Sequence, residues 1–203
     1  MGVTMDKKKT FQQLLAENCT AIAKRISDDM LPHLFLVGGA KKIPVPHEAI
    51  LYRWWFPSNS IVVSALNKQC KKYPELTALL NEVETRTIDG QLYYALYFGK
   101  SNNGYHRYCQ HTTGNVHLST LRHTIYGLCI GDTYDKTKEP LITDILRQCY
   151  CEWISFENEG KLVECIEGIC IALGKYPLNV DGNPAISDGW CKELMAKRKL
   201  KNK

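Results

Sequence analysis

The stretch that decides the fold of this chain is Tyr93-Tyr94-Ala95-Leu96-Tyr97-Phe98-Gly99-Lys100. Its aromatic residues predict a strand, and residues 101–104 supply turn and N-cap chemistry for a following helix. Arg107 and His111 lie one helical turn apart on that helix, so both side chains project from one face. A guanidinium and an imidazole beside a strand end indicate a corner that could hold a phosphate.

Further strands lie on both sides of this stretch. Asp89-Gly90 suits the tight turn of a hairpin, so the residues around it predict two antiparallel strands. An apolar and aromatic run halted by Pro57 and an alternating run from Tyr150 predict two more. The predicted strands cover residues 49–56, 85–88, 91–98 and 150–156.

Helices are predicted where apolar residues recur at helical spacing, or where caps and prolines delimit a segment. These segments cover residues 8–30, 60–83 with a break at Pro74, the region of Arg107, 119–129, 139–148 and 161–173. The sum is an α+β fold, in which helices flank a small, mainly antiparallel sheet and a helical extension precedes it.

The composition is that of an ordinary globular protein, with 44% hydrophobic and 23% charged residues in a chain of 203. No apolar run approaches the length of a membrane span, and the polar N-terminus lacks the apolar segment of a signal peptide. We therefore expect a cytoplasmic protein without membrane contact. The nine cysteines include no Cys-x-x-Cys pair, which excludes the usual zinc spacings and favours reduced thiols.

The net charge of +5 comes from one end of the chain. Residues 197–203 carry five positive charges and no acid, so the remaining residues balance to zero. A basic end of this kind either adds nonspecific contact with a polyanion or is simply solvated. Net charge alone therefore does not indicate a nucleic-acid-binding protein.

The predicted helix 161–173 carries two glutamates, one expected on the solvated face and one that is a candidate site residue. Its apolar periodicity places much of the helix against the core, and Glu164 is expected on the solvated face. Glu167 differs because Asn179 follows it by 12 positions, just past the helix end and Pro177.

Taken together, these residues resemble the GIY-YIG nuclease superfamily, which includes the catalytic domain of a bacterial excinuclease and several restriction and homing endonucleases. Tyr97-Phe98-Gly99-Lys100 is similar to the second tripeptide of that family and its following lysine. Arg107 and His111, ten and fourteen positions after Tyr97, match the positions of the family's arginine and of its histidine or tyrosine.

The resemblance extends to both ends of the motif set. Glu167 and Asn179 are similar to the family's metal-binding glutamate and closing asparagine, and Pro177-Leu178-Asn179 resembles its Pro-x-Asn ending. Ile50-Leu51-Tyr52 stands for the first tripeptide, with the tyrosine but without the glycine. It lies 45 positions before the tyrosine of the second tripeptide, farther than in typical members, so residues 57–92 are predicted to be an insertion.

The resemblance implies three parts of the chain. Residues 1–48 would form an N-terminal helical extension, residues 49–190 a GIY-YIG-like nuclease domain that contains the insertion, and residues 191–203 a basic C-terminal tail.

The activity that the resemblance implies is a metal-dependent endonuclease of the restriction or repair type, which hydrolyses DNA phosphodiester bonds. Mg²⁺, with Mn²⁺ as an alternative, needs only one or two protein carboxylates, so Glu167 alone is chemically sufficient. Arg107 would hold the phosphate by its guanidinium fork. Gly99 and Asn179 would have structural or orienting roles.

The residue that activates the attacking water stays open. Tyr52 or Tyr97 could take the proton, but an ordinary tyrosine needs a nearby cation, such as Lys100 or the metal, to favour phenolate. His111 competes for this role because the ordinary pKa of histidine is more suitable for a base.

Ser119 and Arg122 form a second polar cluster at the start of the predicted helix 119–129. Backbone N–H groups there, together with Arg122, could contact another phosphate. Ordinary capping by Ser119 explains the same residues equally well.

Two other functions fit the sequence. One is a catalytically silent nucleic-acid-binding module with the same fold, which the altered first tripeptide favours. The other is a protein-interaction domain that uses the N-terminal helix and the insertion. The expected partner of the leading interpretation is DNA, and because such domains often need a second protomer, a homodimer is a further expectation.

Overall fold

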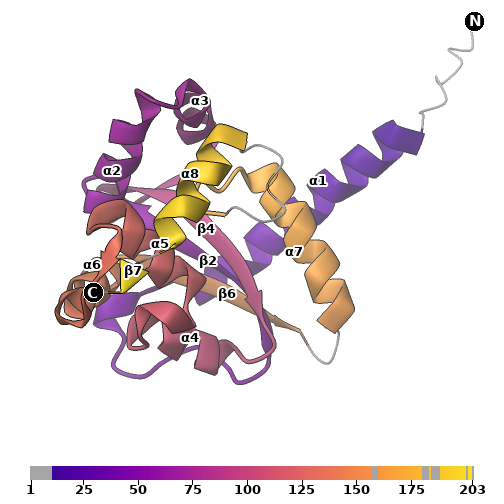
Figure 1. Cartoon of the computed structure of the whole chain (residues 1–203). Helices are drawn as coiled ribbons and strands as arrows, with labels where there is room; N and C mark the ends of the chain where they lie inside the picture. Colours follow the sequence, from indigo (N-terminus) through magenta and orange to yellow (C-terminus); the bar gives the residue numbers. More distant parts are fainter. Residues whose placement is uncertain (1–10, 157–159, 180–182, 184–187, 200, 203) are drawn as a thin grey trace, which may run out of the picture.

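Two long strands, β2 (Ala49–Pro57) and β4 (Gln91–Ser101), form the centre of the sheet (Figure 1). The structure is a computed structural model that describes residues 11–156, 160–179, 183, 188–199 and 201–202. From Ile50 onward every residue of β2 is buried, because helices cover both faces of the sheet. A strand covered on both faces carries a nearly continuous apolar run, which is what the sequence shows here.

The main sheet is antiparallel throughout, as the sequence predicts, with the strand order β1-β6-β2-β4-β3. Its shorter strands are β1 (Phe35–Leu36), β6 (Tyr150–Phe156) and β3 (Thr85–Ile88). A separate parallel pair consists of β5 (Thr133–Tyr134) and β7 (Lys201–Asn202).

The predicted hairpin joins β3 to β4. Asp89 and Gly90 both have positive φ, 49° and 79°, as a tight turn between two right-twisted strands requires. Glycine adopts this conformation without strain, and aspartate tolerates it better than most residues.

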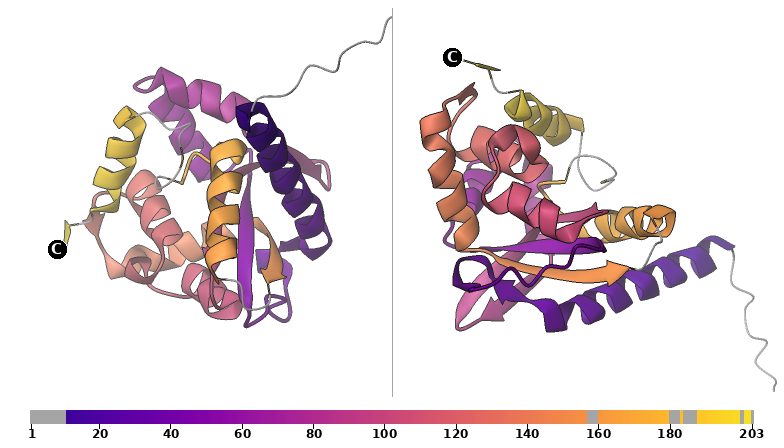
Figure 2. Two further views of the ribbon diagram at one scale, coloured as in Figure 1. Left: turned by 90° about the vertical axis from the view of Figure 1, so that its right-hand side faces the viewer. Right: turned by 90° about the horizontal axis from the view of Figure 1, so that it is seen from below.

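Helices cover the two faces of the sheet unequally, and α1 lies across the sheet from α4 and α5 (Figure 2). The first face packs against α2 (Ile61–Cys70), α3 (Pro74–Glu82), α4 (Gly104–Thr112), α5 (Thr120–Cys129), α6 (Glu139–Arg147) and α8 (Asp188–Arg198). The second face packs against α1 (Phe11–Met30) and α7 (Gly160–Gly174). Short 3₁₀ helices are η1 (Leu31–His33), η2 (Val37–Gly39), η3 (Val116–Leu118) and η4 (Lys136–Lys138).

Local signals account for where several of these helices begin. The Ser60 side chain accepts a hydrogen bond from the Val63 backbone N–H at 3.2 Å and so caps α2. Pro74 is the first residue of α3, where its missing N–H leaves no bond unmade. In the part of the chain that the structure describes, no helix combines the length and the apolar character that a bilayer crossing requires.

The C-terminal region differs from the solvated basic end that the sequence allowed. The predicted boundary at residue 191 falls inside α8, which packs against α5 and buries Trp190 and Leu194. The sequence pattern did not indicate this helix face, because only two of its residues are buried and its last turn is basic.

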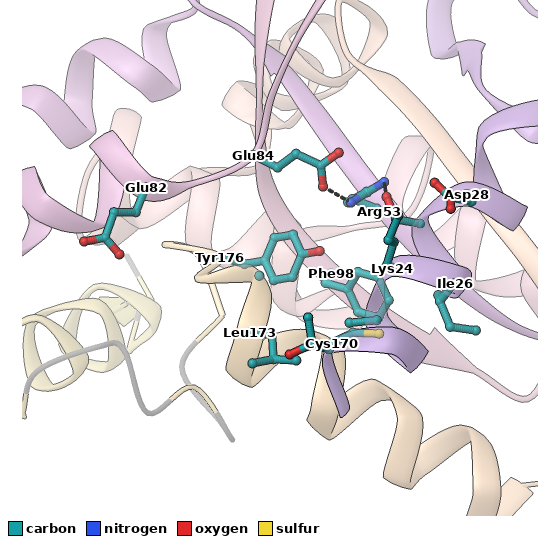
Figure 3. Close-up of a pocket in the computed structure, with 14 residues that line it drawn as sticks. Lys24, Ile26, Asp28, Arg53, Glu82, Glu84, Phe98, Cys170, Leu173 and Tyr176 are labelled. Carbon is teal, nitrogen blue, oxygen red and sulfur yellow. Dashed lines mark hydrogen bonds and ion pairs between the residues drawn. The ribbon is translucent and has the colours of Figure 1, made fainter. Parts of the chain in front are cut away.

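A buried ion network holds the second face together. Arg53 of β2 points into a cavity of about 550 Å³ between α1 and α7, where it pairs with Glu84 (Figure 3). Its guanidinium also pairs with Glu152 of β6, which is fully buried, and Arg86 of β3 bonds the same carboxylate at 3.0 Å. Arg53 donates in addition to the Ser27 hydroxyl of α1 at 2.9 Å. The network therefore links four elements of the fold.

This network gives a prediction about stability. Glu152→Gln removes the fully buried one of the two carboxylates that compensate Arg53, and we expect it to lower the free energy of unfolding by about 3–5 kcal/mol. The matched control is Glu164→Gln, which breaks an exposed pair with Lys100 and should leave the free energy of unfolding almost unchanged. Urea unfolding measures both; equal losses in the two variants would contradict the prediction.

Candidate active site

The two tyrosines of the predicted site lie beside each other on the first face of the sheet. In the β2–β4 register Tyr52 is opposite Gly99, and Trp54 is opposite Tyr97, so Tyr52 and Tyr97 are diagonal neighbours. Their ring centroids are 6.3 Å apart. The register therefore brings together two residues that are 45 positions apart in the chain.

Gly99 makes room for Tyr52. A Cβ atom at position 99 would lie 2.7 Å from the Tyr52 hydroxyl oxygen and 2.8 Å from Cζ, which is closer than van der Waals contact allows. The Tyr52 ring thus lies directly over the glycine of the second tripeptide. Any larger residue at this position would displace the ring.

His111 connects Tyr52 to the start of α5. Its Nε2 lies 2.9 Å from the Tyr52 hydroxyl oxygen, and its Nδ1 lies 2.6 Å from Ser119 Oγ. The Trp54 ring meets the imidazole edge-on at a centroid distance of 5.7 Å. His111 is only 1% exposed, so it is not on the exposed helix face that would have been its ordinary location.

Burial sets the protonation of this imidazole. Desolvation, assisted by the positive charges of Arg107 and Arg122, lowers the pKa of His111 to about 3. His111 is therefore neutral at physiological pH, with one ring nitrogen that donates and one that accepts.

Burial also keeps the tyrosines neutral. Desolvation raises the pKa of Tyr52 well above its ordinary value, and the neighbouring Tyr97 raises it further, whereas Arg107 lowers it. The pKa of Tyr97 is raised as well, again chiefly by desolvation. In the resting site both hydroxyls keep their protons and act as hydrogen-bond donors.

Arg107 is the cation of this cluster that lacks an acidic partner. It is half-buried on α4, and its Nε is buried without a hydrogen-bond partner. Among the described residues its guanidinium forms no ion pair, although its charge acts on Tyr52, Tyr97 and His111. A partly desolvated guanidinium that is not paired with a carboxylate favours the binding of an anionic ligand.

Glu167 lies on α7, which packs against β4 and β2 from the second face of the sheet. Partial burial raises the pKa of its carboxyl, against the opposing effects of the Lys100 charge and of the Lys100 backbone N–H. Its charge in turn raises the pKa of Tyr52 and of Tyr97. Glu167, Arg107 and both tyrosines are thus close enough to interact electrostatically.

A divalent cation fits this carboxylate. Within the described residues no three side chains from His, Cys, Asp and Glu form a group that could hold a metal. A single oxygen ligand suits Mg²⁺ or Mn²⁺, which keep several waters, better than zinc, which requires a fuller protein ligand set. A nearby positive charge would also relieve the desolvation that raises the pKa of Glu167.

Lys100 is beside this carboxylate but is already engaged. Strand alternation places its side chain on the α7 side of β4, opposite to Tyr97. There its Nζ donates to Glu164 at 2.7 Å. The charge of Lys100 thus lowers the pKa of Glu167, whereas it is not among the causes that shift the pKa of either tyrosine.

Asn179 closes the open edge of β4. Strand β3 pairs only with the first half of β4, so the edge from Leu96 onward needs other partners. The Asn179 side chain accepts from the Phe98 N–H at 2.9 Å and donates to the Phe98 carbonyl at 2.7 Å, while the Leu178 N–H donates to the Leu96 carbonyl at 3.0 Å. The amide side chain imitates one residue of a neighbouring strand.

Ser119 and Arg122 lie inside the molecule. Ser119 caps α5 by accepting from the Arg122 N–H at 3.1 Å, one of the two roles that the sequence left open. Arg122 is 1% exposed and pairs with Glu139 at 2.7 Å, so it would reach a phosphate only if that pair opened. The contact between Ser119 and His111 is the feature of the site that sequence reasoning missed, and the helix-capping pattern contained no signal for it.

Comparisons with known proteins support the resemblance seen in the sequence. A family model described as the GIY-YIG catalytic domain matches residues 50–200. This match includes Tyr52, Tyr97, Arg107, Glu167 and Asn179. Curated proteins and solved structures provide no match.

The role of Asn179 can be tested by hydrogen exchange. Asn179→Ala removes both bonds to Phe98, so we expect a loss of about 1–3 kcal/mol in the free energy of unfolding and fast exchange of the Phe98 amide. Asn179→Asp keeps the acceptor but loses the donor, so the Phe98 amide should stay protected in a destabilised protein. Slow Phe98 exchange in the alanine variant would show that the edge is sealed in another way.

The buried His111 makes stability depend on pH. Its pKa is about 3 in the folded chain and about 6.5 when exposed, so the unfolded state binds more protons in this range and stability falls as pH falls through it. Between about pH 7 and about pH 5 this group should remove about 2 kcal/mol of stability.

His111→Gln should therefore lose about 2 kcal/mol less than the wild type over that interval in urea unfolding. His106→Gln, on the exposed face of the same helix, is the matched control and should lose as much as the wild type. The same pH dependence in His111→Gln and the wild type would contradict the assigned burial.

Proposed function

Because this chain belongs to the GIY-YIG nuclease superfamily, we propose that it is a metal-dependent endonuclease that hydrolyses phosphodiester bonds in DNA. The observation that carries the proposal is Arg107, whose guanidinium forms no ion pair among the described residues and whose charge acts on the same two tyrosines as the charge of Glu167. A structural arginine in a protein interior normally has an acidic partner, as Arg53 and Arg122 have here.

Arg107 binds the scissile phosphate in this proposal. Its guanidinium offers two parallel donors to two phosphate oxygens, and partial burial strengthens the attraction. An anion at this position supplies a partner to the orphaned Nε. Substrate binding thus satisfies a group that the folded chain leaves unsatisfied.

Glu167 holds the divalent cation, for which we propose Mg²⁺, with Mn²⁺ as a substitute. When bound, such an ion neutralises charge on the phosphate and stabilises the departing oxygen. Glu167 and Arg107 then act on the phosphate from two elements, α7 and α4. Lys100, beside Glu167, limits the negative charge that accumulates there before the ion binds.

Tyr52 and His111 act together as the base. The attacking water gives its proton to the Tyr52 oxygen as its own oxygen bonds to phosphorus, and the Tyr52 proton passes to His111 Nε2. The bond from phosphorus to the departing oxygen breaks, and that oxygen takes a proton from solvent. Two of the three bases that the sequence left as alternatives, Tyr52 and His111, thus form one hydrogen-bonded pair.

Substrate binding makes His111 a better base. The charge of Arg107 is one of the causes that lower the pKa of His111, and a bound phosphate offsets that charge. The imidazole therefore accepts a proton more readily when the substrate is in place than in the free protein.

The altered first tripeptide does not remove a group from this site. Ile50 occupies the place of the family's glycine and is 2% exposed within the core, where it packs against Gly104. Tyr52, the residue of that tripeptide that reaches the site, is retained. A catalytically silent module is therefore the weaker interpretation. The homodimer and the cytoplasmic location stay predictions.

The two glutamates of α7 provide a matched pair of variants. Glu167→Gln should lower Mg²⁺-dependent cleavage of supercoiled plasmid by at least about 100-fold, because it removes the proposed metal ligand. Glu164→Gln, on the exposed face of the same helix, should cleave like the wild type, and EDTA should abolish both activities.

Equal cleavage by Glu167→Gln and Glu164→Gln would contradict the assignment of Glu167. Salt-sensitive DNA binding without cleavage by the wild type would instead favour the silent nucleic-acid-binding module. Absence of DNA binding at low salt would favour the protein-interaction domain.

A further inference from the structure

Ser119 makes two hydrogen bonds that place it between the backbone and the site. Its Oγ accepts from the Arg122 N–H at 3.1 Å as the N-cap of α5, and it lies 2.6 Å from His111 Nδ1. Ser119 is 2% exposed, so solvent does not compete for either bond. Among the described residues the hydroxyl forms no hydrogen bond with Tyr52 or Arg107, so we expect any effect on the reaction to pass through His111.

The chemistry of the two neighbours decides which nitrogen of His111 carries the proton. A neutral imidazole has one donor and one acceptor, and both of its nitrogens have a hydroxyl partner here. A phenol is intrinsically a better hydrogen-bond donor than an aliphatic alcohol, which favours donation from Tyr52 even though burial raises its pKa. This favours the arrangement in which Nε2 accepts from Tyr52 and Nδ1–H donates to Ser119.

The surroundings hold this arrangement in place. Arg122, whose N–H bonds Ser119, also donates from Nη1 to the His111 carbonyl at 3.0 Å. Its Nη2 is held by Glu139 at 2.7 Å. One buried ion pair thus orients both the backbone of His111 and the residue that its side chain contacts.

We propose that Ser119 is a positioning residue, which fixes His111 in the tautomer whose Nε2 accepts the Tyr52 proton. This inference rests on the proposed function. In the hydrolysis of the phosphodiester, Ser119 would orient the base His111. This role replaces the direct phosphate contact that the sequence suggested for Ser119. Without the hydroxyl, Nδ1–H loses its acceptor, and the other tautomer turns Nε2 into a donor that cannot take the proton.

The test uses glycine, because glycine caps a helix at a cost of only a few tenths of a kcal/mol relative to serine. Ser119→Gly in the full chain removes the hydroxyl with little loss of helix stability. Ser60→Gly is the matched control, since Ser60 is the buried N-cap of α2 and contacts no histidine among the described residues. Ser119→Thr keeps a hydroxyl and a competent cap.

Two measurements are made on each variant. In plasmid cleavage with Mg²⁺, Ser119→Gly should lower kcat by about 10- to 100-fold with little change in KM, whereas Ser60→Gly should keep the wild-type kcat. In ring ¹⁵N–¹H correlation spectra, with His111→Gln to assign the signal, the proton of His111 should be on Nδ1 in the wild type and in Ser119→Thr. In Ser119→Gly it should move partly to Nε2.

The outcomes separate this inference from the proposed function. If Ser119→Gly keeps the wild-type kcat or the wild-type tautomer, Ser119 does not position His111. If the wild type does not cleave DNA, the proposed function fails, and the spectra of the wild type and Ser119→Gly still decide whether Ser119 sets the tautomer.

Discussion

The register between β2 and β4 is the constraint on which the rest of the site depends. It places Tyr52 over Gly99, so the ring occupies space that a Cβ would fill, and it sets Tyr97 diagonally beside it. A slip of one residue would turn Tyr52 to the opposite face of the sheet, where Arg53 meets Glu152. The same slip would bring Arg53 into the tyrosine cluster. The buried ion network on one face and the candidate site on the other therefore enforce the same register.

The open edge of β4 is the second structural problem that the fold solves. An unpaired strand edge leaves backbone groups unsatisfied, and here Asn179 and Leu178 provide their partners. These residues follow directly after α7, so the same connection that seals the edge also places α7 beside the end of β4. Glu167 lies on that helix, from which its charge acts on both tyrosines. A residue without direct contact with the reacting groups thus determines where the proposed metal ligand lies.

The electrostatics of the site are incomplete in the free chain. His111 is buried between two arginines, the tyrosines are desolvated, Glu167 is partly desolvated, and Arg107 has no acidic partner among the described residues. The partly desolvated charges of Arg107 and Glu167 oppose stability, and a ligand of opposite charge would offset each of them: an anion at Arg107 and a cation at Glu167. By contrast, Arg53 and Arg122 are fully paired and stabilise the fold.

The sequence by itself predicted most of the elements and named the candidate site residues, whereas the contacts among those residues required the tertiary structure. The hairpin at Asp89-Gly90, the break at Pro74 and the strand that ends at Pro57 follow from local backbone preferences, which act within a few positions. The resemblance to the family also named Tyr97, Arg107, His111, Glu167 and Asn179 as candidate site residues from their spacing.

Three features were beyond the reach of that reasoning: the apolar stripe of α8, the burial of Arg122, and the bond from Ser119 to His111. Each depends on how α5 packs against α4, α6 and α8, and such packing joins residues whose relative positions no local pattern encodes. The sequence thus indicates which chemical groups are present, and the packing determines which of them are in contact and which form hydrogen bonds.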